Sequence, residues 1–233
     1  MDSSNKLIVA LDVDSFADMQ RIVQAIGPDV STYKIGHQLF TAEGPQTIAY
    51  LKDLGKAVFL DLKLHEIPNS VAQAVQAAGQ HGVSMLTVHA SGGAKMMQAA
   101  VQAASHFPEL KILALTVVTG LSDHDLATIG FAYKSADLGL HLATLAKTSG
   151  CHGVIASPQE VGRIRRRLGD ECLIVTPGVR LTELDGDDQA RTGTPRQALL
   201  AGASHVIVGR PVIQADNPAL AVRRILETIK PDS

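Results

Sequence analysis

Tryptophan is absent from this 233-residue sequence, and all aromatic residues together make up only 3% of it. Because hydrophobic residues still account for 45%, the core must be built mainly from aliphatic side chains. Aliphatic strands are typical of a parallel sheet that is buried on both faces. An excess of basic residues is also missing, since the formal net charge is −2. We therefore expect no general attraction to nucleic acid or to an anionic membrane, so any anion must be bound locally.

Cysteines and long apolar runs are equally scarce. The only two cysteines, Cys151 and Cys172, lie far apart and match no metal-binding spacing, which favours buried thiols in a reducing cytoplasm. The nine histidines form no His-x-x-x-His pair. The first apolar run, Leu7–Leu11, is followed at once by Asp12 and Asp14, so we expect neither a signal peptide nor a membrane span. No targeting signal is expected, and the sequence favours a cytoplasmic protein.

Short apolar runs of strand length alternate with amphipathic stretches of helical length along the whole chain. The expected strands are 7–13, 31–36, 57–63, 85–90, 111–118, 153–158, 172–179 and 205–212. The expected helices are 15–26, 43–54, 69–81, 93–106, 135–148, 159–168, 195–201 and 217–229. Eight such units predict a single (β/α)8 TIM-barrel catalytic domain over residues 1–233, in the α/β class. A doubly wound open sheet is the rival, but it usually has a glycine-rich first turn, and the turn Leu11–Ser15 contains no glycine.

In this fold the active site forms at the C-terminal ends of the strands. Polar residues stand at these positions although charged residues are otherwise rare in the runs: Asp12, Lys34, Asp61, Lys63, His89, Thr116, Thr119, Arg180, and Arg210 preceded by Gly209. Each one alone could be a charge in a solvated loop. Solvated loops do not readily explain why so many polar residues fall at the same end of successive strands. This arrangement predicts a site at the barrel mouth.

Asp61 and Lys63 are two residues apart on one expected strand, which places them on the same face, roughly 6–7 Å apart at Cα. Lys34 on the adjacent strand would reach the same space. Burying such charges rarely repays their desolvation, so function is the better explanation of this cluster. A lysine flanked by carboxylates stays protonated and is held in position, which suits proton donation more than Schiff-base chemistry.

The last two expected strands predict a phosphate site. Gly209-Arg210 and Pro177-Gly178 would offer backbone N–H groups and a guanidinium where barrels bind phosphate. The alternative is an ordinary turn at the end of the strand. The polar stretch 180–193 is too long for a tight turn, and we interpret it as an active-site loop rather than a surface excursion without a role.

At these residues the sequence resembles the orotidine 5′-phosphate decarboxylase family. The segment 61–70, which reads Asp-Leu-Lys-Leu-His-Glu-Ile-Pro-Asn-Ser, is similar to the family signature D-x-K-x-x-D-I-P-N-T. The resemblance continues through almost the whole chain in the same order, in the segments 10–12, 33–36, 88–90, 176–180, 188–191 and 208–211.

The resemblance implies a decarboxylation of orotidine 5′-phosphate to uridine 5′-phosphate without a metal or an organic cofactor. It implies that Lys63 protonates C6, that Asp61 lies against the substrate carboxylate, and that Lys34 completes the charged array and contacts the ribose. The remaining implied roles are ribose binding by Asp12, pyrimidine binding by Thr119, and phosphate binding by Arg180, Gln189, Gly209 and Arg210. It also implies a homodimer in which each site is completed by the neighbouring subunit, with no nucleic-acid or membrane partner.

One departure from the signature affects the charged array. The third acidic position, which the family fills with aspartate and contributes across the dimer interface, is Glu66 in this sequence. The charge is kept, but the extra methylene moves the carboxylate by about 1 Å, which could misalign a tight array. A structural interpretation is also open, because an acidic residue before Pro68 suits a helix N-terminus. We expect decarboxylation to persist.

Two other kinds of protein remain as alternatives. 3-Keto-L-gulonate 6-phosphate decarboxylase and hexulose phosphate synthase share the third-strand motif and use Mg²⁺, but they typically carry an acidic metal ligand on the second strand, where this chain has Lys34-Ile35-Gly36. The second alternative is a nucleotide-binding barrel that has lost catalysis through Glu66. It would bind uridine monophosphate without releasing carbon dioxide.

Overall fold

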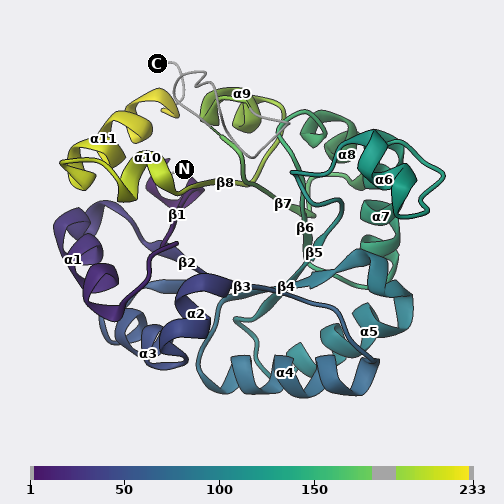
Figure 1. Cartoon of the computed structure of the whole chain (residues 1–233), viewed down its shortest axis with the longest axis horizontal. Helices are drawn as coiled ribbons and strands as arrows, with labels where there is room; N and C mark the ends of the chain where they lie inside the picture. Colours follow the sequence, from purple (N-terminus) through teal and green to yellow (C-terminus); the bar gives the residue numbers. More distant parts are fainter. Residues whose placement is uncertain (1–2, 180–192, 231–233) are drawn as a thin grey trace.

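The computed structural model describes residues 3–179 and 193–230 and forms a closed barrel of eight parallel strands in the order β1 to β8. Figure 1 looks down this barrel and shows the strands as an inner ring with the helices around it. The strands are β1 (Leu7–Ala10), β2 (Thr32–Gly36), β3 (Ala57–Leu64), β4 (Met85–His89), β5 (Lys111–Leu115), β6 (Gly153–Ile155), β7 (Leu173–Thr176) and β8 (His205–Val208). The predicted (β/α)8 TIM barrel is confirmed.

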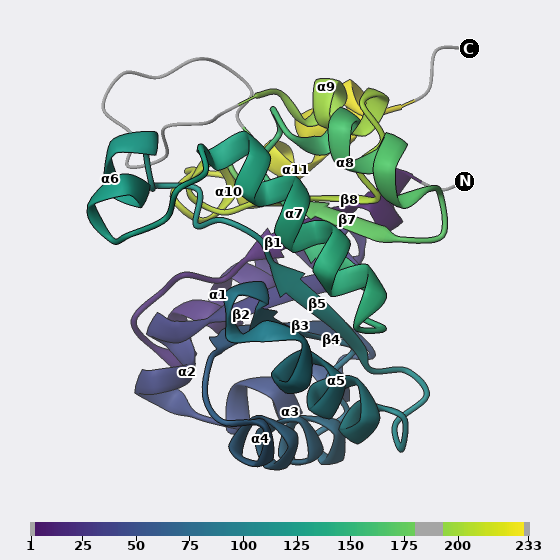
Figure 2. The ribbon, with the colours of Figure 1, turned by 90° about the vertical axis from the view of Figure 1, so that its right-hand side faces the viewer.

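Each of the eight predicted helices is present within a few residues of its expected bounds. They are α1 (Phe16–Ile26), α3 (Gln46–Asp53), α4 (Pro68–Gln80), α5 (Gly93–Ala104), α7 (Ser135–Thr148), α8 (Val161–Leu168), α9 (Pro195–Leu200) and α11 (Pro218–Thr228). Three further short helices were not predicted, namely α2 (His37–Glu43), α6 (Asp123–Thr128) and α10 (Arg210–Ile213). All three follow the C-terminal end of a strand, and Figure 2 shows α6 standing out from the body of the barrel.

Most predicted strands extend too far at their C-terminal ends. The apolar run of the first one continues to Leu11 and Val13, but the strand ends at Ala10, and the last one ends at Val208 rather than at 212. Leu11 and Val212 are nonetheless fully buried. Burial therefore continues past the last ladder hydrogen bond, and a hydrophobic pattern cannot locate where strand pairing stops.

Two separate apolar cores hold the barrel together. The larger one lies between the strands and the surrounding helices, as expected for a sheet whose outer face is covered. The smaller one fills the barrel interior and consists of Ile8, Ala10, Phe59, Met85, Leu113, Leu115, Ile155, Val175 and Ile207. Of these, Ala10, Phe59, Leu115, Ile155 and Ile207 also line the cavity at the barrel mouth and so form its floor.

Within the described part of the chain, no helix combines the length and the hydropathy that crossing a membrane would require.

Candidate active site

A cavity of about 680 Å³ opens at the C-terminal ends of the strands. Predicted site residues from both halves of the barrel line it, namely Asp12, Lys34, Asp61, Lys63, Thr119, Gly209 and Arg210. Asp12 just after β1, Lys34 in β2, and Asp61 and Lys63 in β3 supply its charged side. The residues after β7 and β8, including Pro177 and Gly178, supply the other side.

Four alternating charges form the charged cluster of this cavity. The Lys63 Nζ donates to Asp61 Oδ2 at 2.8 Å, and the Lys34 Nζ lies 3.7 Å from the same oxygen. The Lys34 Nζ also donates to Asp12 Oδ1 at 2.9 Å. Lys34 and Asp61 are both only 8% exposed, so the Lys34–Asp61 contact is largely desolvated, whereas the side chains of Lys63 and Asp12 are 29% and 46% exposed. The predicted juxtaposition of Lys63 with Asp61 and Lys34 is present.

Asp61 is the centre of the charged cluster. Burial raises the pKa of its carboxyl group, but the positive charges of Lys63 and Lys34, together with hydrogen bonds from Lys63 and Thr87, outweigh burial and bring the pKa below its ordinary value. The carboxylate is therefore ionised at neutral pH. The Asp61 carboxylate therefore places a fixed negative charge in the wall of the cavity.

The backbone at Lys63 is unusual. Its φ of 49° lies in the left-handed region, and among the described residues it is the only non-glycine with a positive φ. The ladder between β3 and β4 is interrupted here, because Leu60 pairs with Leu86 and Leu64 with Val88, so that the three residues 61–63 lie opposite the single residue Thr87. Because the strand is irregular at this bulge, the Lys63 side chain can turn back and place its ammonium group against the Asp61 carboxylate.

Two side chains that the sequence did not indicate hold this bulge. The Thr87 hydroxyl accepts a hydrogen bond from Lys63 N at 2.8 Å and donates one to Asp61 Oδ1 at 2.9 Å. His37 Nε2 lies 2.9 Å from the carbonyl oxygen of Leu62. The only sequence signal for Thr87 is that of a hydroxyl residue within an otherwise apolar run.

The other side of the cavity carries the residues predicted to bind phosphate. Gly209 precedes α10, and Arg210 is the exposed first residue of that helix. The surroundings of Gly209 are open, because even a Cβ built on it would meet only Ala10 and Asp12 atoms, at 3.5 Å and beyond. Arg180 and Gln189, the other two residues in the predicted phosphate site, and nearly all of the predicted loop lie outside the described residues.

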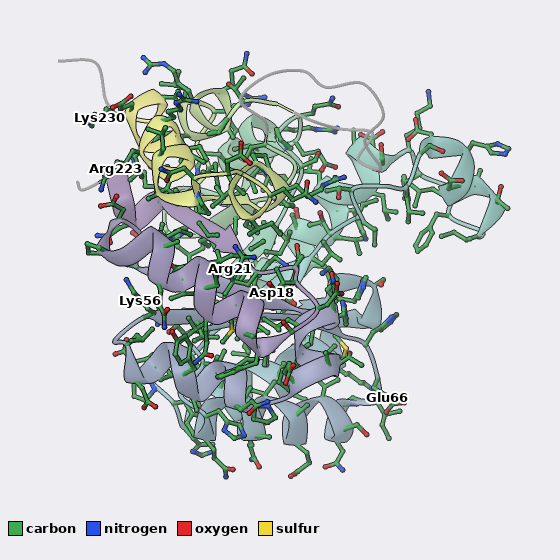
Figure 3. The ribbon with its side chains drawn as sticks, turned by 60° about the vertical axis from the view of Figure 1, so that its left-hand side comes forward. Asp18, Arg21, Lys56, Glu66, Arg223 and Lys230 are labelled. Carbon is green, nitrogen blue, oxygen red and sulfur yellow. The ribbon has the colours of Figure 1, made fainter. Side chains whose placement is uncertain are left out.

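Glu66 does not line the cavity of its own chain. Its side chain is exposed, and Oε2 accepts a hydrogen bond from the backbone N–H of Ile67 at 2.7 Å, next to the start of α4. Figure 3 shows Glu66 at the periphery of the molecule, remote from Asp18 and Arg21. Glu66 thus lies just before the N-cap residue Ile67, and its side chain makes no hydrogen bond into the first turn of α4. A role in a neighbouring subunit's cavity remains a prediction.

Several further polar side chains line the cavity without having been predicted as site residues. Asp14 and Gln38 are hydrogen bonded to each other, with Gln38 Nε2 2.6 Å from Asp14 Oδ1. Asp18 and Arg21 form an ion pair at 3.1 Å on α1, at the outer edge of the cavity. The sequence signal for Asp14 was its place just after the first apolar run, but only the tertiary structure shows that it faces the cavity.

Across residues 3–179 and 193–230, histidine, cysteine, aspartate and glutamate side chains nowhere gather in groups of three or more that could hold a metal ion. The acid–base chemistry available at the charged cluster is that of a protonated amine held against a carboxylate. Such an ammonium group can deliver a proton to a carbon or oxygen atom placed beside it. The Asp61 carboxylate would repel a second anionic group brought into contact with it.

The chain is similar to known proteins in both sequence and fold. Residues 5–225 match the model of the family described as "Orotidine 5'-phosphate decarboxylase / HUMPS family". The chain is 44% identical over 221 residues to an orotidine 5′-phosphate decarboxylase of Saccharophagus degradans, covering 94% of this chain and 93% of that protein. It is 43% identical to one of Anaeromyxobacter dehalogenans, covering 97% and 98%. The crystal structure of the Lactobacillus acidophilus orotidine 5′-phosphate decarboxylase superposes with a TM-score of 0.87 at 35% identity, covering 97% of this chain and all of that one.

Proposed function

The chain belongs to the orotidine 5′-phosphate decarboxylase / HUMPS family, and we propose that it converts orotidine 5′-phosphate to uridine 5′-phosphate and carbon dioxide. The observation that carries this proposal is the 2.8 Å contact between the Lys63 ammonium group and the Asp61 carboxylate within the cavity. The reaction requires a proton donor at one atom and an environment that disfavours a substrate carboxylate nearby. The Lys63–Asp61 pair provides both.

In the proposed reaction the bond between C6 and the carboxylate carbon breaks, carbon dioxide leaves, and the electron pair stays on C6. Lys63 then donates a proton from Nζ to C6 and is reprotonated from solvent. Asp61 disfavours the bound carboxylate by charge repulsion, which is relieved as neutral carbon dioxide departs. Lys34, whose Nζ lies 3.7 Å from Asp61 Oδ2, helps to keep the Asp61 carboxylate ionised. The repulsion on the substrate carboxylate then comes from this one side chain.

We assign the remaining residues to substrate binding. Asp12 and Lys34 contact the ribose, and Thr119 contacts the pyrimidine. Gly209 and Arg210 hold the 5′-phosphate together with Arg180 and Gln189, because a guanidinium and backbone N–H groups match a phosphate dianion. The support for this orientation is that Lys63 of β3 and Arg210 at the start of α10 line the same cavity.

Neither a metal nor an organic cofactor enters this scheme, because Lys63 supplies the proton and Asp61 supplies the electrostatic effect. We further propose a homodimer in which Glu66 of one subunit approaches the cavity of the other. Its exposed position outside its own cavity supports this arrangement. A cytoplasmic location is proposed because both cysteines, Cys151 and Cys172, are buried and unpaired, as is usual in a reducing compartment.

The test is the loss of orotidine 5′-phosphate absorbance on mixing with protein that has been treated with a chelator. We expect turnover that does not depend on added Mg²⁺. Turnover restored only by Mg²⁺, or activity on a sugar phosphate instead, would assign the chain to the metal-dependent relatives. Tight binding of uridine monophosphate with no release of carbon dioxide would show a binding protein and contradict the proposal.

A further inference from the structure

We propose that Thr87 is a positioning residue that sets the geometry of both Lys63 and Asp61, an inference that rests on the proposed decarboxylase function. Thr87 lies in the middle of β4, is fully buried and does not line the cavity. Its hydroxyl group nevertheless bonds to both members of the pair that carries the chemistry. Thr87 therefore lies behind Asp61 and Lys63, which stand between it and the substrate.

The hydroxyl group replaces a missing backbone partner. Between the pairs Leu60–Leu86 and Leu64–Val88, three residues of β3 (61–63) lie opposite one residue of β4. Thr87 is the residue of β4 inside this interval. Its Oγ1 accepts the hydrogen bond of the Lys63 N–H at 2.8 Å, so the side chain does what a ladder carbonyl would do in a regular strand.

This hydrogen bond fixes a disfavoured backbone conformation. Lys63 has a φ of 49°, where the Cβ of any residue other than glycine is crowded by its own backbone. Such a conformation persists only when the surroundings hold it in place. If the Lys63 N–H lost its hydrogen-bond partner, the backbone of Lys63 should relax toward an extended conformation. This change would move its ammonium group away from Asp61.

The same hydroxyl group orients the Asp61 carboxylate. Thr87 Oγ1 donates to Oδ1 at 2.9 Å, while Oδ2 receives the Lys63 ammonium at 2.8 Å and faces Lys34 at 3.7 Å. The two carboxylate oxygens are thus divided between a neutral donor on one side and two cations on the other. Because one hydroxyl has a single proton and two lone pairs, it satisfies Asp61 and Lys63 at the same time.

Two substitutions separate this role from ordinary packing. Thr87→Val keeps the shape of the side chain and removes the hydroxyl, whereas Thr87→Ser keeps the hydroxyl and removes a methyl group. The matched control is Thr116→Val. Thr116, like Thr87, is a buried threonine, and it lies just after β5. Its hydroxyl donates a hydrogen bond to the carbonyl oxygen of Ile155 at 3.0 Å and forms none with Lys63 or Asp61.

We expect Thr87→Val to lower kcat by about 100-fold, with KM changed by less than about threefold, because the reacting groups move by about 1 Å while the substrate-binding residues stay in place. Thr87→Ser should keep kcat within about fivefold of the wild-type value. Thr116→Val should keep the wild-type kcat, although it should lose about as much thermal stability as Thr87→Val. Wild-type kcat in Thr87→Val, or an equal loss of kcat in Thr116→Val, would overturn the proposal.

A second measurement does not depend on turnover. Amide hydrogen exchange at Lys63, followed by NMR, should be faster in Thr87→Val than in the wild-type protein and in Thr87→Ser. If the wild-type protein does not decarboxylate orotidine 5′-phosphate, the proposed function fails. Faster exchange would then still support the positioning role, and unchanged exchange would overturn it.

Discussion

The ammonium nitrogen of Lys34 lies 2.9 Å from Oδ1 of Asp12, and this ion pair occupies the space beside the Cα of Gly36. A Cβ built on Gly36 would come within 2.9 Å of Lys34 Nζ and 3.0 Å of Asp12 Oδ1. The φ of Gly36 is −101°, which any residue can adopt, so the reason for glycine here is space and not backbone conformation.

Gly36→Ala is therefore expected to displace the ion pair without unfolding the chain. Loss of the proposed charge-assisted contact to the substrate's ribose should raise KM by about tenfold. Steady-state kinetics would measure this effect. Gly162→Ala is the control, since its Cβ would meet its nearest neighbours only at 3.7 Å and beyond in α8. It should leave KM unchanged and stabilise the protein by up to about 1 kcal/mol. An unaltered KM in Gly36→Ala would contradict the assigned role of the pair.

Lys63→Ala is expected to lower kcat by about 100-fold or more, because the proposed proton donor to C6 is removed. The decrease in orotidine 5′-phosphate absorbance measures turnover. Lys95→Ala is the control, since Lys95 is exposed on α5. Turnover retained by Lys63→Ala would remove the proposed proton donor.

Glu66→Asp is expected to give a kcat equal to or above that of the wild-type protein, because it shortens the side chain to the length that the family signature carries. A kcat well below the wild-type value would show that the array in this chain is adjusted to glutamate. The change should leave the folded structure intact, since Glu66 is exposed and bonds only locally to Ile67 N.

Mixed dimers test whether Glu66 acts in the neighbouring subunit. Glu66→Ala and Lys63→Ala are each expected to be inactive, but subunits of the two variants exchanged in equal amounts should recover about one quarter of the wild-type sites if each site combines residues of both chains. Recovery would be followed by the same absorbance assay. No recovery, with subunit exchange demonstrated, would place the role of Glu66 within its own chain.

Stability should decrease on mild acidification. Burial, followed by the charge of Lys6, lowers the pKa of His205, and its Nδ1 is buried without a hydrogen-bond partner in the described structure. Because the folded-state pKa lies below the ordinary 6.5, the unfolded chain binds the proton first as pH falls below that value. The free energy of unfolding should therefore decrease from pH 7 to pH 5.

Denaturant unfolding at several pH values would measure this dependence. His205→Gln should reduce its slope by up to one proton, because the titrating group is removed. His81→Gln is the control, since His81 is exposed at the end of α4. A slope in His205→Gln equal to that of the wild-type protein would show that other groups cause the loss of stability. His89 and His152 are the first candidates, because burial lowers their pKa values as well.

The order of the barrel could be read from the sequence because it depends on local patterns. Eight aliphatic runs separated by amphipathic stretches specify strands and helices through hydrophobic periodicity, which needs only neighbouring residues. The same patterns placed Asp12, Lys34, Asp61 and Lys63 at strand ends, and parallel strands bring such ends together. The exact ends of the strands could not be found in this way, since residues such as Leu11 stay buried after pairing stops.

What the sequence alone determined is the barrel and the set of charged residues at its mouth. Only the tertiary structure decided how these residues face one another. Lys63 reaches Asp61 from a left-handed backbone in a bulge, and that bulge is held by Thr87, which lies 24 residues from Lys63 in the chain. The contact depends on the register of two paired strands and on the space between them, and neither is encoded in any short segment.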